Sequence, residues 1–305
     1  MRKLWTVFCV FVWSSVFSTE VATWSFSDVN SGWNSDSLVK MYFHHSEMQR
    51  QWAWELLGRS PFTGYEKILD FGCGDGKISA EMSHLTRHGK VVGVDISKKM
   101  IHFAHIHFPP SLYPSLEFRE SDSLTLADLQ EKEEYDMICS FAVFHLVADP
   151  LEVLKNLKTN LKPEGKILLV IPAGENPVFY QAATEMFVKY NLEIPWATTT
   201  GLKKTTMRTL EGASFFMREA GYSIESIELI NKASAFYDLE DLIAWMIGTI
   251  TANWKIPVSM TQAFCSNLVH RMYELNPSMI DEEGRVHFGL SRICVIAHPK
   301  NKSST

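Results

Sequence analysis

Three glycines between two aspartates carry the clearest chemistry in this sequence. An apolar run, 67–71, leads into the glycines and an amphipathic segment, 77–85, follows them; the three are Gly72, Gly74 and Gly76. Glycine lets the backbone adopt positive φ and pass close to a ligand, and the start of a following helix has unpaired N–H groups. Asp70 stands two residues before the first glycine, and Asp95, 19 residues after the last one, could accept both hydroxyls of a ribose. The pattern predicts a strand, a ligand-binding turn and a helix.

The spacing of the glycines and the position of Asp70 indicate a cationic ligand. A dinucleotide-binding turn has the spacing G-x-G-x-x-G, whereas this turn has G-x-G-x-G. In a dehydrogenase the place of Asp70 faces a pyrophosphate, which a carboxylate would repel, so both features argue against that class. S-adenosylmethionine (SAM) has no phosphate and carries an ammonium and a sulfonium group. We therefore interpret the turn as a SAM site.

The turn resembles motif I of the class I SAM-dependent methyltransferases, and the similarity extends over about residues 65–172. Segment 92–97 resembles the ribose-binding strand end of that family, Asp122 resembles the acid near the adenine amino group, and segment 140–145 resembles the wall around the methyl group. Met100 takes a place that often packs on adenine, and Cys73 is a small spacer in the loop. The resemblance implies that SAM is the cofactor and that its contacts include Asp70, Gly72, Cys73, Gly74, Gly76, Asp95, Ile96, Met100, Asp122, Ser123 and Phe141.

A narrower resemblance concerns the segments on either side of this region. Tyr42 and Gln49 ahead of the turn, and a helical stretch before the last strand, are similar to juvenile hormone acid and trans-aconitate methyltransferases. In such proteins a lead-in helix closes over the methionine end of SAM, so the resemblance implies that Tyr42 and Gln49 also contact the cofactor. Those enzymes methylate carboxylates of small molecules, and the chain is therefore expected to O-methylate a small carboxylic acid. N- or C-methylation of another small molecule, and SAM binding without turnover, remain alternatives.

One histidine follows the fourth predicted strand. The resemblance puts His145 near the transferred methyl group, as a wall of the site or as a general base. A carboxylate acceptor is ionised near pH 7 and needs no base, whereas a phenol or an amine would need one. Aromatic residues at 196, 236, 237, 245 and 254 are expected to be core residues, with some of them lining an apolar substrate pocket.

Strand and helix patterns alternate through most of the chain. Predicted strands cover 67–71, 91–94, 116–119, 135–141, 166–171, 222–230 and 286–297, and predicted helices cover 77–85, 97–105, 150–161, 178–190, 210–220, 239–252 and 260–275. Such alternation with buried apolar strands predicts an α/β fold with a doubly wound, mostly parallel sheet, and the family resemblance adds an antiparallel last strand. A turn at 162–165 precedes the fifth strand.

Four segments are expected in the chain. They are a leader at 1–18, a helical lead-in at 24–60, the methyltransferase domain at 61–299, and a helical insertion at about 236–284 within that domain. The insertion exceeds the usual connection length, and long insertions are often functional. We expect it to cover the substrate.

Composition excludes several other classes. Hydrophobic residues make up 46% of the chain and the net charge is −6, so the chain is globular and lacks the basic character of a nucleic-acid binder. The five cysteines form no C-x-x-C pair and no zinc-like spacing, and no metal site is predicted.

The first residues are typical of a secretory signal peptide. A basic start is followed by an almost wholly apolar run, 4–17, with small residues before a cleavage point after Ser18. No other stretch approaches about 18 consecutive apolar residues, so no membrane span is expected beyond the leader. The leader suggests export or tethering, whereas dependence on SAM suggests a cytosolic site of action. The sequence does not indicate an oligomeric state.

Overall fold

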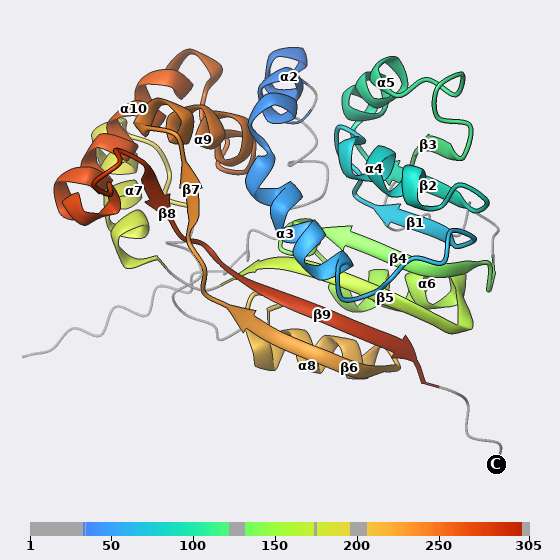
Figure 1. Cartoon of the computed structure of the whole chain (residues 1–305). Helices are drawn as coiled ribbons and strands as arrows, with labels where there is room; N and C mark the ends of the chain where they lie inside the picture. Colours follow the sequence, from blue (N-terminus) through green and yellow to red (C-terminus); the bar gives the residue numbers. More distant parts are fainter. Residues whose placement is uncertain (1–32, 34, 122–131, 174–175, 196–205, 301–305) are drawn as a thin grey trace, which may run out of the picture.

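A seven-stranded sheet forms the centre of the computed structural model, which describes residues 33, 35–121, 132–173, 176–195 and 206–300 (Figure 1). Its strands are β1 (Lys67–Phe71), β2 (Lys90–Asp95), β3 (Leu116–Glu120), β4 (Tyr135–Phe141), β5 (Leu161–Ala173), β6 (Tyr222–Ile230) and β9 (Ser291–Pro299). The strand order is β3-β2-β1-β4-β5-β9-β6, and β9 alone runs antiparallel to its neighbours. The predicted doubly wound sheet with an antiparallel last strand is confirmed.

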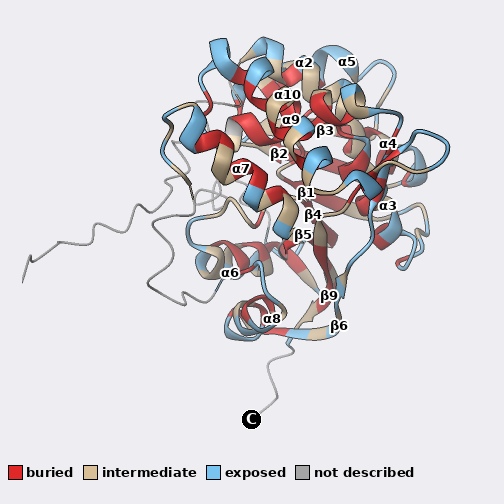
Figure 2. Ribbon diagram, turned by 90° about the vertical axis from the view of Figure 1, so that its left-hand side faces the viewer, coloured by how far each residue is buried: buried red, intermediate tan, exposed pale blue. Residues whose placement is uncertain are grey.

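Helices cover both faces of this sheet. One face packs against α3 (Glu47–Leu57), α4 (Lys77–Leu85) and α5 (Lys98–His107), and the other against α6 (Pro150–Asn160) and α8 (Leu210–Glu219). Figure 2 shows the buried residues concentrated between the sheet and these helices. The order of the strands reverses between β1 and β4, because the chain moves outward from β1 to β3 and then returns. Ligands bind at such a switch point, outside the carboxyl ends of the strands.

A helical cap gathers at one end of the sheet (Figure 1). It consists of α7 (Pro177–Lys189), α9 (Leu239–Asn253), α10 (Val258–Leu275), the 3-10 turn Pro277–Met279 and a two-stranded sheet of β7 (Ser234–Phe236) and β8 (Val286–Phe288). Aromatic contacts hold it together: the Phe187 and Phe264 ring centroids lie 5.2 Å apart, and those of Phe179 and Trp254 lie 5.3 Å apart. The helices α9 and α10 lie within the predicted insertion, and α7 joins them from outside it.

The lead-in helix is broken into two. Helix α2 (Asp36–His45) and α3 meet at Ser46, and α2 packs against α9 of the cap. The expected leader at 1–18 and residues 24–32 of the lead-in lie outside the described residues, as does Trp196.

Two predicted elements were wrong in detail. The single strand expected at 286–297 is two strands, β8 and β9, because the chain passes from the small sheet to the large one at Gly289 and Leu290. The turn expected at 162–165 lies inside β5: Leu161 pairs with Tyr135 and Lys166 with Met137, so four residues bulge opposite one residue of β4. Among the described residues, no helix is both long and apolar enough to cross a membrane.

Candidate functional site

The loop between β1 and α4 has the backbone that its glycines predict. Gly72, Gly74 and Gly76 have φ of 77°, 54° and 80°. A Cβ on Gly72 would lie 2.3 Å from a methyl group of Val143, and one on Gly76 would lie 2.5 Å from the Phe118 ring. At Gly74 the nearest atom would be Cε1 of Tyr42 at 3.7 Å, so this glycine faces the lead-in helix. The outer two glycines are therefore required for packing, and the middle one brings the backbone close to α2.

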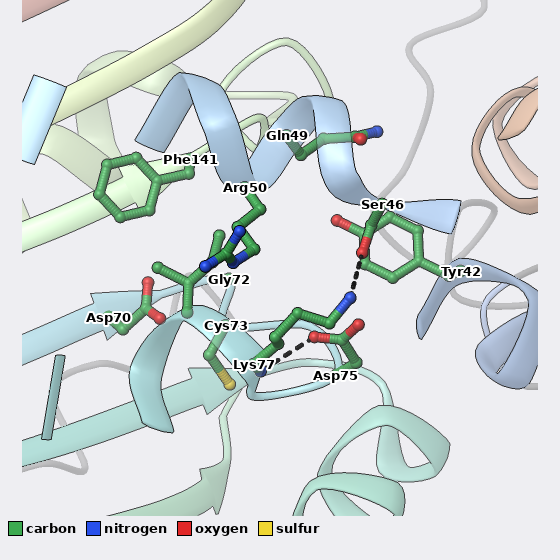
Figure 3. A pocket seen from close by; sticks show the side chains of 11 residues that line it. Tyr42, Ser46, Gln49, Arg50, Asp70, Gly72, Cys73, Asp75, Lys77 and Phe141 are labelled. Carbon is green, nitrogen blue, oxygen red and sulfur yellow. Dashed lines mark hydrogen bonds between the residues drawn. The ribbon is translucent and has the colours of Figure 1, made fainter. Parts of the chain in front are cut away.

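A pocket lies between this loop and the corner where α2 meets α3 (Figure 3). The side chains around it come from the lead-in helices, from the ends of β1 and β4, and from the start of α4. They are Tyr42, Ser46, Gln49, Arg50, Asp70, Gly72, Cys73, Asp75, Lys77, Ile78 and Phe141. Six of these residues, including Phe141 at the end of β4, were predicted from the sequence.

Two buried carboxylates face the pocket. Asp70 is 2% exposed, and Ser79 Oγ donates to its Oδ2 at 2.5 Å. Burial raises the pKa of Asp70 to about 7; the Ser79 hydrogen bond opposes this rise, while Asp95 and Asp75 add to it. Asp75 is 4% exposed, and its Oδ2 has no hydrogen-bond partner among the described residues. Burial raises the pKa of Asp75 as well. An unpartnered buried carboxylate oxygen is costly unless a donor or a cation meets it.

Asp75 is a residue that the sequence analysis missed. It stands between the second and third glycines of the loop, and an acid inside a glycine-rich turn is the signal that could have identified it. Its other oxygen, Oδ1, accepts the backbone N–H of Lys77 at 3.0 Å, which fixes the carboxylate at the start of α4.

Asp95 lies beside the same loop. Its Oδ2 accepts the Gly74 N–H at 2.9 Å and its Oδ1 accepts the Ser97 N–H at 2.8 Å. Burial raises the pKa of Asp95, and these backbone donors oppose the rise. Ile96 follows directly, and Met100 is buried on α5, where its N–H donates to Ser97 Oγ at 3.2 Å. The structure thus brings Asp70 and Asp95 to one end of neighbouring strands.

The lead-in helices close the pocket from the other side. Lys77 Nζ donates to the Phe43 carbonyl at 2.5 Å and to Ser46 Oγ at 3.2 Å, which ties α4 to the α2–α3 corner. Arg50 pairs with Glu81 at 2.6 Å and with Glu47 at 3.0 Å. Burial raises the pKa of Tyr42, so its hydroxyl stays neutral. None of Ser46, Arg50 and Lys77 was expected from the sequence.

Four other predicted residues remain: His145, the pocket residue Cys73, Asp122 and Ser123. His145 follows β4 but does not line this pocket; burial lowers its pKa to about 3, the Arg208 guanidinium adds to this effect, and its Nδ1 has no partner among the described residues. Burial raises the pKa of the Cys73 thiol well above its usual range, which argues against a nucleophile. Asp122 and Ser123 lie outside the described residues.

The described part of the chain holds no cluster of three or more His, Cys, Asp or Glu side chains arranged to bind a metal ion. The pocket instead presents Asp70 and Asp75, close to Asp95, beneath the lead-in helices α2 and α3. A ligand that carries a positive charge and hydroxyl groups fits this set: the cation compensates the unpartnered Asp75 Oδ2, and Asp95 retains lone pairs that are not used by the backbone.

Comparisons with known proteins agree with this chemistry. Residues 63–214 match a family model described as a methyltransferase domain. The trans-aconitate 2-methyltransferase of Escherichia fergusonii is 30% identical over 271 residues, which cover 86% of this chain and 98% of that one. The malonyl-[acyl-carrier protein] O-methyltransferase of a Paenibacillus species is 28% identical over 52% of this chain and 59% of its own length.

A solved structure supports the same fold. The phosphoethanolamine N-methyltransferase 2 of Haemonchus contortus, solved with phosphomonomethylethanolamine and S-adenosylhomocysteine, matches 90% of this chain and 60% of its own, with a TM-score of 0.56 and 14% identity. At that identity the similarity concerns the fold alone.

Proposed function

Because this chain belongs to the class I SAM-dependent methyltransferases, we propose that it methylates a carboxylate oxygen of a small organic acid. SAM is its cofactor and supplies an electrophilic methyl group on a sulfonium that leaves readily. What we propose is the chemical class of the molecule that accepts the methyl group. Two relatives support the choice, since the names of the trans-aconitate and malonyl-[acyl-carrier protein] O-methyltransferases denote acceptors that carry carboxyl groups.

In this proposal the residues of the pocket hold the cofactor. Asp70 and Asp75 would receive the ammonium group of its methionine end, because both are buried carboxylates and Asp75 Oδ2 has no partner among the described side chains. Asp95 would accept the ribose hydroxyls, and Gly74 leaves room for the ligand beside Tyr42. Ile96, which follows Asp95 directly, and Met100 of α5 would pack on the adenine.

The choice of a carboxylate rests on the acceptors that the two relatives' names denote, and the weak basicity of His145 agrees with it. With a pKa of about 3, its imidazole holds a proton too weakly to take one from a phenol or an ammonium group near pH 7. A carboxylate acceptor has a pKa near 4 and is already ionised. The enzyme would then contribute by aligning the two reactants and excluding water, which accounts for up to roughly 7–11 kcal/mol of a barrier. We keep His145 as a wall of the acceptor site rather than as a base.

The chemistry of the methylated product tests this proposal. The full chain is incubated with methyl-labelled SAM and a panel of di- and tricarboxylic acids, each with its amide as a matched control. We expect labelling of the acids but not of the amides, and release of volatile labelled methanol in mild alkali, because a methyl ester is hydrolysed there. Label that resists alkali would overturn the proposal in favour of N-, C- or phenolic methylation.

A parallel calorimetric titration with S-adenosylhomocysteine separates a second outcome. Binding of this product without methyl transfer to any acid or to a metabolite extract would identify a SAM-binding protein that does not turn over. The expected result is binding together with transfer.

A further inference from the structure

One hydrogen bond joins the helical cap to the pocket. Trp245 of α9 donates its indole N–H to Oε1 of Gln49 at 3.1 Å, across 196 positions of the sequence. Both residues are buried, with exposed fractions of 2% and 8%. Gln49 lines the pocket from the lead-in helix α3, as Figure 3 shows, whereas Trp245 is not among the lining residues. The tryptophan is therefore linked to the pocket through the glutamine.

The chemistry of the indole fixes the orientation of the glutamine amide. An indole N–H donates and has no acceptor, so the amide oxygen must be the atom that faces Trp245. The NH₂ group, with its two donors, then points away from the indole N–H. No hydrogen bond from Gln49 Nε2 to any described residue is present, and this atom is not among the fully buried unpartnered ones. The NH₂ group is thus left available to a ligand.

Trp245 is itself held in one position. Its ring packs against Phe236 of β7, with ring centroids 5.9 Å apart, and against Phe288 of β8, at 5.6 Å. These two strands pair with each other, and Phe236 pairs with Val286. A rigid donor of this kind removes the freedom of the amide to flip, and such preorganisation improves binding because less order has to be gained when the ligand arrives.

The charges of the pocket make this amide the group suited to an anion. Asp70 and Asp75 favour cations. The two basic residues of the lining are engaged elsewhere, Arg50 with Glu81 and Glu47, and Lys77 with the Phe43 carbonyl and Ser46. Among the described residues, the Gln49 NH₂ is a neutral donor with no such engagement.

We propose that Trp245 is a positioning residue that holds the Gln49 amide with its NH₂ group toward the pocket, where it donates to a carboxylate. This carboxylate belongs either to the methionine end of the cofactor or to the acceptor acid. The second possibility rests on the proposed function. In the first case Asp70 and Asp75 receive the ammonium group and Gln49 receives the carboxylate of the same amino-acid end.

Two substitutions remove opposite halves of this arrangement. Trp245→Phe keeps the aromatic packing and deletes the N–H, so the amide remains but is free to flip. Gln49→Glu keeps the acceptor for Trp245 and replaces the two donors by a charge that repels a carboxylate. Trp254→Phe is the matched control, since it makes the same change in the aromatic packing of the cap at a residue that has no contact with Gln49 among the interactions described.

Calorimetry with two ligands identifies the source of the carboxylate. S-adenosylhomocysteine carries the carboxylate, and S-adenosyl-3-thiopropylamine is the same molecule without it. If the cofactor is the source, Trp245→Phe weakens binding of the first by about 3- to 10-fold, as expected for one hydrogen bond, and Gln49→Glu weakens it by at least about 30-fold. Binding of the second ligand changes less than about twofold in both variants.

If the acceptor is the source, both cofactor ligands bind the variants as they bind the parent protein. The same substitutions then weaken binding of the methyl-accepting acid to the protein saturated with S-adenosylhomocysteine. Equal losses of affinity for both cofactor ligands would overturn the proposal. So would variants that only melt at a lower temperature, while their preference for the ligand with the carboxylate and their affinity for the acid stay unchanged. If no acid binds the parent protein, the proposed function fails separately, and the comparison of the two cofactor ligands decides alone.

Discussion

The backbone N–H of Gly74 donates to Oδ2 of Asp95 at 2.9 Å, although the two residues lie 21 positions apart. This bond connects the loop after β1 to the end of β2. A second backbone donor, Ser97 N–H, occupies Oδ1. Each carboxylate oxygen has further lone pairs, so Asp95 shapes the loop and still has acceptors for a ligand. One residue therefore couples the form of the loop to recognition of the ribose.

This double use predicts the effect of substituting Asp95. Asp95→Asn keeps an acceptor for one backbone N–H but loses the charge and half of the acceptor capacity. Since hydrogen bonds to a charged group contribute about 1.5–3 kcal/mol, we expect S-adenosylhomocysteine to bind about 100-fold more weakly while the far-ultraviolet circular dichroism stays unchanged. Glu120→Gln, at the end of β3, is the control and should bind normally. Normal binding by Asp95→Asn would refute the assignment of this residue.

Asp70 predicts a pH dependence of cofactor binding. Its pKa is about 7 in the ligand-free protein, and the ammonium group of the ligand favours the ionised form. Binding below pH 7 must therefore release a proton, and the affinity should fall about tenfold between pH 8 and pH 6. Calorimetry in buffers of different ionisation enthalpy measures this proton directly.

Ser79→Ala sharpens this prediction. The Ser79 hydrogen bond lowers the pKa of Asp70, so its removal should move the midpoint of the pH dependence upward. A midpoint that stays in place, or an affinity that is flat from pH 6 to pH 8 in the parent protein, would show that Asp70 does not meet the ammonium group.

The same carboxylate should make the ligand-free protein less stable at alkaline pH. The pKa of Asp70 is raised to about 7 in the folded protein, above its ordinary value of 3.8. Its protonated form therefore stabilises the fold fully below pH 3.8, and this stabilisation is lost as the pH rises through about 7. Because asparagine carries no charge, Asp70→Asn avoids this loss in the free energy of unfolding, which amounts to up to about 4 kcal/mol at pH 8. We expect this variant to have a higher free energy of unfolding than the parent at pH 8, to differ less at pH 5, and not to bind the cofactor. Urea unfolding at both pH values measures the difference.

The sequence predicted the sheet and the loop well because both are local in the chain. Strand bounds at 67–71 and 135–141 agree with the structure, since a short apolar run next to a glycine turn has few other conformations. The bulge in β5 was not predictable in this way. Residues 162–165 have the composition of a turn, and their position opposite Asp136 depends on pairing with a distant strand.

The side chains that close the site depend on tertiary packing and were harder to predict. Ser46 and Lys77 come together because α2 and α3 fold back onto the start of α4, and the contact of Gln49 with Trp245 joins the lead-in helix α3 to the cap. The hydrophobic periodicity of a single segment cannot reveal pairs of residues that lie so far apart in the sequence. Asp75 differs, because its position inside the glycine turn was visible in the sequence.

Packing around the loop predicts a position-specific cost for adding one methyl group. A Cβ on Gly76 would lie 2.5 Å from the Phe118 ring and 2.8 Å from Ala104, at a φ of 80°. Overpacking costs about 1–3 kcal/mol, and positive φ about 1–2 kcal/mol more. Gly284→Ala is the matched control, since its φ is 82° and nothing lies within 4 Å of the added carbon. Chemical denaturation should show a larger loss for Gly76→Ala, and equal losses would contradict the packing at this position.

An ion pair between a buried arginine and a partly exposed glutamate of α3 gives the last prediction. Arg292 of β9 is 1% exposed, pairs with Glu55 of α3, and lies with its guanidinium carbon 5.2 Å from the centre of the Trp52 ring. Glu55→Ala would leave this buried charge without its partner; because the Glu55 side chain is 36% exposed, we expect a cost below the about 3–5 kcal/mol of a fully buried pair but above that of a surface pair. Lys232 pairs with the same carboxylate at 2.7 Å, but its side chain is 66% exposed. Lys232→Ala should therefore cost less than about 1 kcal/mol.

The double variant Glu55→Ala/Arg292→Met separates the pair from the packing around it. Replacing both charges removes the uncompensated guanidinium, and an apolar side chain of similar length fills the space beside Trp52, so we expect most of the stability lost in Glu55→Ala to return. Denaturation of the three variants measures this directly. If Glu55→Ala and Lys232→Ala lose the same free energy of unfolding, the buried position of Arg292 does not govern how α3 is held on the sheet.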